Sequence, residues 1–115
     1  MTGPAIDAGD EIVEIRTTFD AAADAETCAT TVVRDRLAAC GQIDGPIRST
    51  YRWQGAVETA TEWRCTFKTT VARSAACQAA IAAAHSYETP EIILVRAIAS
   101  PAYAAWVRAS VGDEP

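Results

Sequence analysis

The segment from Glu11 to Phe19 alternates between polar and apolar side chains over most of its length. The side chains on its apolar side are Val13, Ile15, Thr17 and Phe19. A period of two places these residues on one face of an extended chain, because successive side chains of a strand point to opposite faces. The pattern therefore predicts a half-buried strand.

The spacing then changes to three and four residues, which is typical of a helix with one buried face. Asp20 or Asp24 can cap this helix, since a carboxylate accepts hydrogen bonds from its first N–H groups. We expect the helix to continue to Cys40 and to end at Gly41, because glycine readily adopts the left-handed conformation that closes helices. The predicted buried stripe consists of Ala25, Cys28, Ala29, Val32, Val33, Leu37 and Cys40.

Two more alternating segments follow, from Gln42 to Trp53 and from about Ala56 to Thr69. Asp44-Gly45-Pro46 interrupts the first and indicates a turn or bulge that bends the strand. Gln54-Gly55 separates the two segments, which predicts a long hairpin with its turn at this dipeptide.

A second helix is predicted from about Val71 to His85, capped by Thr69 or Thr70. Its expected buried line is Ser74, Cys77, Ile81 and Ala84. The segment from Ile92 to Ile98 reads as a central strand, because its first half is apolar on both faces.

A short helix completes the pattern, beginning at Ser100-Pro101, where proline fits the first helical position, and ending at Gly112. The side chains expected to share its buried face are Tyr103, Trp106, Val107 and Ser110.

The element order is therefore β-α-β-β-α-β with a terminal helix, which predicts an α+β domain of the ferredoxin-like plan over residues 11–112. Residues 1–10 and 113–115 are expected to be tails. One helical layer cannot bury all the large aromatic side chains, and an uncovered apolar patch usually marks an interface. We therefore expect self-association in which the long hairpin reaches a neighbouring copy. The aromatic residues in question are Tyr51, Trp53, Trp63 and Trp106.

Composition narrows the possible functions. The 115 residues suffice for one hydrophobic core, and the formal charge of −5 argues against nucleic-acid binding, which needs an excess of Lys and Arg. The longest strongly apolar run, Ile92 to Val95, is too short to cross a membrane, and the first residues do not resemble a signal peptide. A cytoplasmic protein with no nucleic-acid or membrane partner is expected. The four cysteines have no metal-ligand spacing, and we expect buried free thiols rather than disulfides.

Four motifs together carry a family resemblance. They are R-L-A-A-C (36–40), Y-R-W-Q-G (51–55), F-K-T-T (67–70) and H-S-Y-E-T-P-E-I (85–92). In this order and at these distances, the chain resembles the CutA family of divalent-cation tolerance proteins from about Glu11 to Val111. The resemblance implies a tight homotrimer of ferredoxin-like subunits, a link to divalent cations such as copper, and no catalytic reaction. It implies no required cofactor; Cu(II) or another divalent cation is the candidate.

His85 is the only histidine and opens the last motif. Imidazole suits Cu(II), and the resemblance matches His85 to a histidine implicated in copper binding. Alternatively, His85 stabilises the end of its helix and bonds nearby carbonyl groups. The chain departs from the family at three places: Ser86 replaces a usual proline, Ala84 replaces a second histidine of some members, and Arg16 replaces a cysteine ligand of some members.

Six further residues are candidates for an inter-subunit cleft: Tyr51, Trp53, Lys68, Tyr87, Glu88 and Glu91. The aromatic side chains would line the cleft or simply pack the trimer. Lys68 would hold an anionic group or remain a surface charge, and the two glutamates would bind a cation or form interface ion pairs.

Three hypotheses follow. The first is a non-enzymatic trimeric CutA-like protein that binds copper weakly through His85. The second is a trimeric signalling protein of the PII type, which binds a small anionic ligand in its clefts or a protein partner on its surface. The third is an enzyme on the same trimer, with Lys68, Tyr87 and Glu88 in one pocket.

Overall fold

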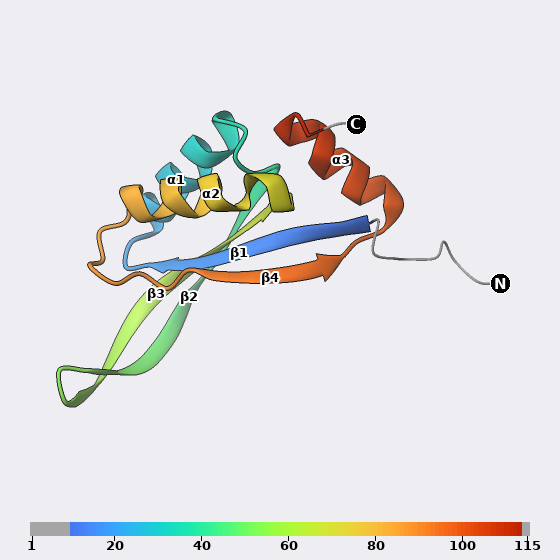
Figure 1. Cartoon of the computed structure of the whole chain (residues 1–115). Coiled ribbons are helices and arrows are strands. Elements are labelled where there is room, and N and C mark those ends of the chain that lie inside the picture. The colour runs from blue at the N-terminus through green and yellow to red at the C-terminus, as the bar shows by residue number, and fades with distance from the viewer. Residues whose placement is uncertain (1–9, 114–115) are drawn as a thin grey trace.

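A computed structural model describes residues 10–113; the expectations for residues 1–9, 114 and 115 lie outside this range. The elements, shown in Figure 1, are β1 (Glu11–Phe19), α1 (Ala22–Arg34), β2 (Cys40–Trp53), β3 (Ala56–Thr69), α2 (Val71–Ala84), β4 (Ile93–Ile98) and α3 (Pro101–Val111). The four strands form one antiparallel sheet in the order β2-β3-β1-β4. The predicted α+β class and element order are thus confirmed.

The core lies between the sheet and the helices α1 and α2, which cover one of its faces (Figure 1). Val13, Ile15 and Phe19 point into this core from β1, as their alternation predicts. Phe67 lies directly across from Ile15 in the β1–β3 register and joins the same cluster. The neighbouring positions of these strands therefore point to the opposite face.

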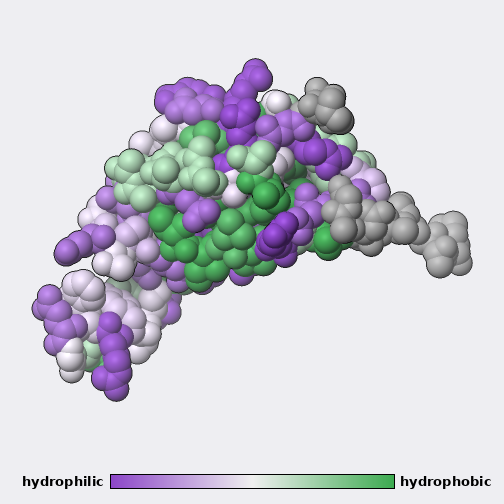
Figure 2. Space-filling model, viewed as in Figure 1, coloured by the Kyte–Doolittle hydropathy of each residue, from purple (hydrophilic) through white to green (hydrophobic). Residues whose placement is uncertain are grey.

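The strand β4 lies at the edge of the sheet, so the prediction of a central strand is wrong. Three of its large apolar side chains, Ile93, Leu94 and Ile98, are between 40% and 48% exposed. Figure 2 shows hydrophobic side chains gathered over β4 and α2. The two-sided apolar pattern of β4 therefore reflects side chains that residues 10–113 leave nearly half exposed.

The prediction for the end of the first helix is also wrong. The helix α1 ends at Arg34, and Arg36 turns the chain with a φ of 59°. Ala39 N–H then donates to the Lys68 carbonyl at 2.8 Å, and Cys40 already belongs to β2. Leu37 and Cys40 have the spacing of a helical stripe, but the backbone from Ala39 onward forms its hydrogen bonds with β3 instead of within a helix.

Helix caps follow the sequence at two of three starts. Thr70 accepts from Arg73 N–H at 3.3 Å and Ser100 accepts from Tyr103 N–H at 3.4 Å, as predicted. At α1 the cap is Ala21, with no side-chain bond, so neither predicted aspartate caps this helix. Asp24 lies in its first turn instead, where a negative charge favours the helix dipole.

The helices α2 and α3 bury fewer side chains than predicted. In α2, Cys77 and Ile81 are buried as expected, whereas Ser74 is half-buried and Ala84 is exposed. In α3, only Val107 of the expected face is buried. The residues that pack under α3 form a second cluster: Ile12, Ala39, Ala104, Val107 and Val111. Since Ile12 points away from the first core, α3 covers one end of the opposite sheet face.

The cysteines are free thiols throughout residues 10–113, as predicted. Cys28, Cys65 and Cys77 are buried in the first core, whereas Cys40 is half-buried. Burial raises the pKa of the Cys65 and Cys77 thiols to about 12 and raises the pKa of Cys28. These three side chains therefore act as small apolar groups.

Asp113 is bonded although it was expected to belong to a tail. Its carboxylate accepts a hydrogen bond from the Thr70 hydroxyl and forms an ion pair with Arg73, whose Nε lies 3.2 Å away. These contacts attach the end of α3 to the start of α2. The helix itself ends at Gly112, whose φ is 78°.

The bend of β2 gives a stability test. Gly45 lies at the register shift between β2 and β3, its φ is 149°, and a Cβ there would lie 2.8 Å from Trp63 Cδ1. Gly45→Ala should therefore lower the free energy of unfolding by about 2–4 kcal/mol, from overpacking and backbone strain together. Denaturant unfolding measures the change.

The control is Gly55→Ala at the hairpin turn, where φ is also positive but no atom lies within 4 Å of the new Cβ. This variant should lose only about 1 kcal/mol, from backbone strain alone. Equal losses in the two variants would contradict the packing argument at Gly45.

Candidate functional site

The ring of His85, just after α2, is stacked on an aromatic ring and hydrogen-bonded through both of its nitrogens. It stacks on Phe19 of β1 with a centroid distance of 4.3 Å and an interplanar angle of 9°. Its Nδ1 accepts from Tyr87 N–H at 3.1 Å, so the ring proton belongs on Nε2. Nε2 lies 2.8 Å from the Thr18 carbonyl oxygen, to which it donates, and 3.1 Å from Thr17 Oγ1.

These bonds leave no ring nitrogen of His85 with a free lone pair. Among residues 10–113, moreover, no three His, Cys, Asp or Glu side chains come together as a group that could hold a metal. Within residues 10–113 of one chain, the donor set therefore does not fit a copper site, and His85 links the end of α2 to β1.

Tyr87 extends this polar cluster to β3. Its hydroxyl donates to Glu62 Oε2 at 2.8 Å, and Glu62 is only 8% exposed. Burial and the bond to Glu62 raise the pKa of Tyr87 well above its ordinary range. The segment after α2 is thus bonded to two strands through His85 and Tyr87.

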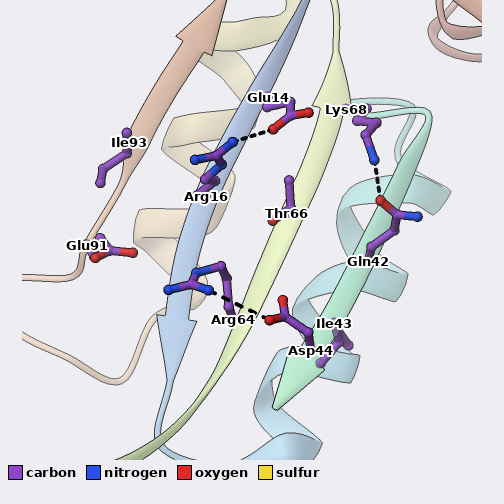
Figure 3. Close-up of a pocket in the computed structure, with 10 residues that line it drawn as sticks. All are labelled: Glu14, Arg16, Gln42, Ile43, Asp44, Arg64, Thr66, Lys68, Glu91 and Ile93. Carbon is purple, nitrogen blue, oxygen red and sulfur yellow. Dashed lines mark hydrogen bonds and ion pairs between the residues drawn. The ribbon is translucent and has the colours of Figure 1, made fainter. Parts of the chain in front are cut away.

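A separate groove of about 710 Å³ lies on the sheet face opposite α1 and α2 (Figure 3). Its walls come from β1, β2, β3 and the start of β4. The lining residues are Glu14, Arg16, Gln42, Ile43, Asp44, Arg64, Thr66, Lys68, Glu91 and Ile93. The strand register explains the grouping, because Gln42 faces Thr66 and Thr66 faces Arg16 across neighbouring strands.

Three ionic or polar bonds arrange the groove (Figure 3). Arg16 bonds Glu14 at 2.9 Å, Arg64 lies 3.7 Å from Asp44, and Lys68 Nζ donates to Gln42 Oε1. The pairs are partly exposed and contribute little stability individually. Their importance is that they place charge around an open groove.

Within one chain, the residues predicted for an inter-subunit cleft do not all lie together. Lys68 and Glu91 share the groove, whereas Tyr87 belongs to the buried cluster with His85. The exposed Tyr51 and Trp53 lie toward the end of the hairpin, which projects beyond the body of the subunit (Figure 1). The exposed Glu88 is not among the groove residues, so one chain does not bring Lys68, Tyr87 and Glu88 into one pocket.

Several residues of both sites were missed in the sequence. Arg64, Gln42 and Asp44 line the groove, and Glu62 anchors Tyr87, but none was a candidate. The alternation of Glu62, Arg64, Thr66 and Lys68 was visible, yet only the antiparallel register tells which partners lie across from them.

The fold and the two sites define an α+β protein with a four-stranded antiparallel sheet, three helices and a polar groove on the sheet. Known proteins share this architecture. The family model described as "CutA1 divalent ion tolerance protein" matches residues 13–110. A probable divalent-cation tolerance protein cutA homolog of Encephalitozoon cuniculi is 36% identical over 100 residues, which cover 86% of this chain and 87% of the relative.

Solved structures agree with these matches. CutA from Synechococcus elongatus superposes with a TM-score of 0.86 at 36% identity, covering 93% of this chain and 96% of that one. A protein described as the periplasmic divalent cation tolerance protein CutA from Archaeoglobus fulgidus superposes with a TM-score of 0.82 at 31% identity, over 87% and 98% of the two chains. The chain belongs to the CutA1 divalent ion tolerance protein family.

The bond between Tyr87 and Glu62 gives a pH test. The raised pKa of Tyr87 means that the folded protein keeps this proton when the unfolded chain, near pH 10, loses it. The stability contributed by the tyrosine is therefore present below about pH 10 and is lost as pH rises beyond it. Tyr87→Phe should melt below wild type at pH 8, and the difference should shrink above pH 10.

Thermal melts of both proteins between pH 7 and pH 11 measure this difference. Tyr103, whose pKa burial and Cys40 raise to about 12, is present in both proteins, so its contribution cancels. A difference in melting temperature that stays constant over this range would contradict the role given to the Tyr87 proton.

Proposed function

We propose that this chain acts as a divalent-cation tolerance protein of the CutA type, working in the cytoplasm as a homotrimer of ferredoxin-like subunits and catalysing no reaction. Family membership supports the link to divalent cations, since the matching model and relatives carry that description. The β-α-β-β-α-β order and the strand order β2-β3-β1-β4 support the ferredoxin-like plan. In the described range no helix has the length and apolarity to span a bilayer.

The proposal of a trimer is supported chiefly by the β4 edge of the sheet. Within residues 10–113, β4 pairs only with β1, which leaves its other edge open, and Ile93, Leu94 and Ile98 are exposed. An open apolar edge attracts another strand, because its free backbone groups and side chains can then be buried. The hairpin of β2 and β3, with exposed Tyr51 and Trp53, offers a strand and apolar area for such a contact.

Leu94→Glu tests this assembly. Wild type should run as a three-chain species in native mass spectrometry and sedimentation, and the variant should dissociate at micromolar concentration. Burying leucine contributes about 1.5–3 kcal/mol, which at each contact corresponds to roughly tenfold or more in affinity. Val71→Glu is the matched control, because Val71 is 52% exposed, against 40% for Leu94, but lies on α2.

Val71→Glu should remain a trimer. A wild-type protein that stays a folded monomer at micromolar concentration would refute the proposed assembly, and equal dissociation of both variants would remove β4 from the interface.

Ligation of Cu(II) by His85 is a hypothesis that rests on the affinity of imidazole for Cu(II) and on the family resemblance. Metal binding would require the ring to give up its bonds to Tyr87 N–H or the Thr18 carbonyl. We therefore expect metal-free wild type and His85→Ala to take up the same amount of Cu(II) in native mass spectrometry. Circular dichroism should first confirm that both proteins are folded. One copper per chain, lost in the variant, would instead identify His85 as a ligand.

A second function, binding of a small ligand as in trimeric signalling proteins, is supported by the groove. Lys68 faces the groove, and among residues 10–113 its ammonium group has an amide oxygen, that of Gln42, and no carboxylate as its partner, so its charge is available to a ligand. The segment after α2, bonded through His85, leads directly to Glu91 on the other side of the same groove.

A further inference from the structure

The charges that line the groove are balanced, but not all are paired. Arg16 is paired with Glu14 and Arg64 with Asp44, which accounts for two cations and two carboxylates. In the described part of the chain, Lys68 and Glu91 are the groove charges without an ionic partner. One cation and one anion therefore remain for a ligand.

These two groups lie on opposite sides of the groove (Figure 3). Lys68 is on β3 and Glu91 lies two residues before the start of β4, with β1 between the two strands. Lys68 pairs with Glu14, which pairs with Val95, and Glu91 lies four residues before Val95. Two strand spacings across the sheet and four residues along it put the two Cα atoms on the order of 16 Å apart, so the side chains do not pair with each other, yet both are long enough to reach a common ligand between them. Ile93, which lines the groove beside Glu91 and is 47% exposed, adds an apolar surface.

We propose that the groove binds a small zwitterion with its carboxylate and ammonium groups at opposite ends of a short aliphatic chain, as in an ω-amino acid or a short peptide. The carboxylate meets Lys68, the ammonium meets Glu91, and the aliphatic chain lies against Ile93. This inference rests on the second function above, small-ligand binding, and gives the chemical class of its ligand.

The charge balance separates this ligand from simpler ions. A phosphate or other pure anion would gain Lys68 but would also approach the carboxylates of Glu14, Asp44 and Glu91. A pure cation would meet the opposite difficulty at Arg16, Arg64 and Lys68. With three cations and three carboxylates, the lining has no net field that concentrates either kind of ion. Only a ligand that carries both charges supplies an ionic partner to both Lys68 and Glu91.

The test uses ε-aminocaproate and its two monofunctional analogues, hexanoate and hexylamine, each titrated into the full-length protein at pH 7. Amide chemical shifts in NMR report binding and its location. We expect ε-aminocaproate to bind about fivefold more tightly than either analogue, since each exposed ion pair adds about that factor at most. The shifts should centre on residues 14–16, 66–68 and 91–93.

Two variants assign the ends of the ligand. Lys68→Met should lower the affinity for ε-aminocaproate to that for hexylamine, and Glu91→Gln should lower it to that for hexanoate. Glu58→Gln, at an exposed position of the hairpin outside the groove, should change nothing. Unchanged melting temperatures show that the variants remain folded.

Equal binding of ε-aminocaproate and hexanoate, or no shifts in the groove at millimolar ligand, would overturn the inference. Sedimentation of the same samples keeps the proposals apart. A trimer that ignores the zwitterion overturns only the ligand, whereas a monomer that binds it overturns only the assembly.

Discussion

The alternation of side chains along β1 is the constraint on which the rest of the molecule depends. β1 is bonded on both sides, to β3 and to β4, so its register fixes both neighbours. Val13 and Ile15 enter the core under the helices, while Glu14 and Arg16 enter the groove. A slip of one residue would exchange these faces and bury charges in the core, which is far more costly than any surface interaction here.

The sheet thereby separates two polar sites of different character. The His85 cluster is fully bonded and part-buried, so it restricts motion of the segment after α2. The groove is open and keeps charged groups exposed to solvent. The two are joined by the chain itself, because the segment that His85 and Tyr87 hold carries Glu91 and then enters β4.

Sequence reasoning succeeded where one local pattern decided the outcome. The alternation from Val13 to Phe19 and the turn at Gln54-Gly55 gave the strand and the hairpin directly. It failed where tertiary pairing competed with a local pattern, as at Cys40, which has helical spacing yet pairs opposite Lys68. The sites show the same limit. Lys68 and Glu91 were visible as charges, but their common groove depends on strand order, which local periodicity does not contain.

The burial of three thiols has a consequence for how motions of this protein can be followed. Cys28, Cys65 and Cys77 lie in one core with raised pKa values, so in the closed molecule they present almost no thiolate to an alkylating reagent. Their modification must wait for the helices to separate from the sheet, and its rate therefore counts openings of the core. The half-buried Cys40, at the start of β2, provides an internal reference, because its rate of modification can be compared with those of the three buried thiols in the same chain.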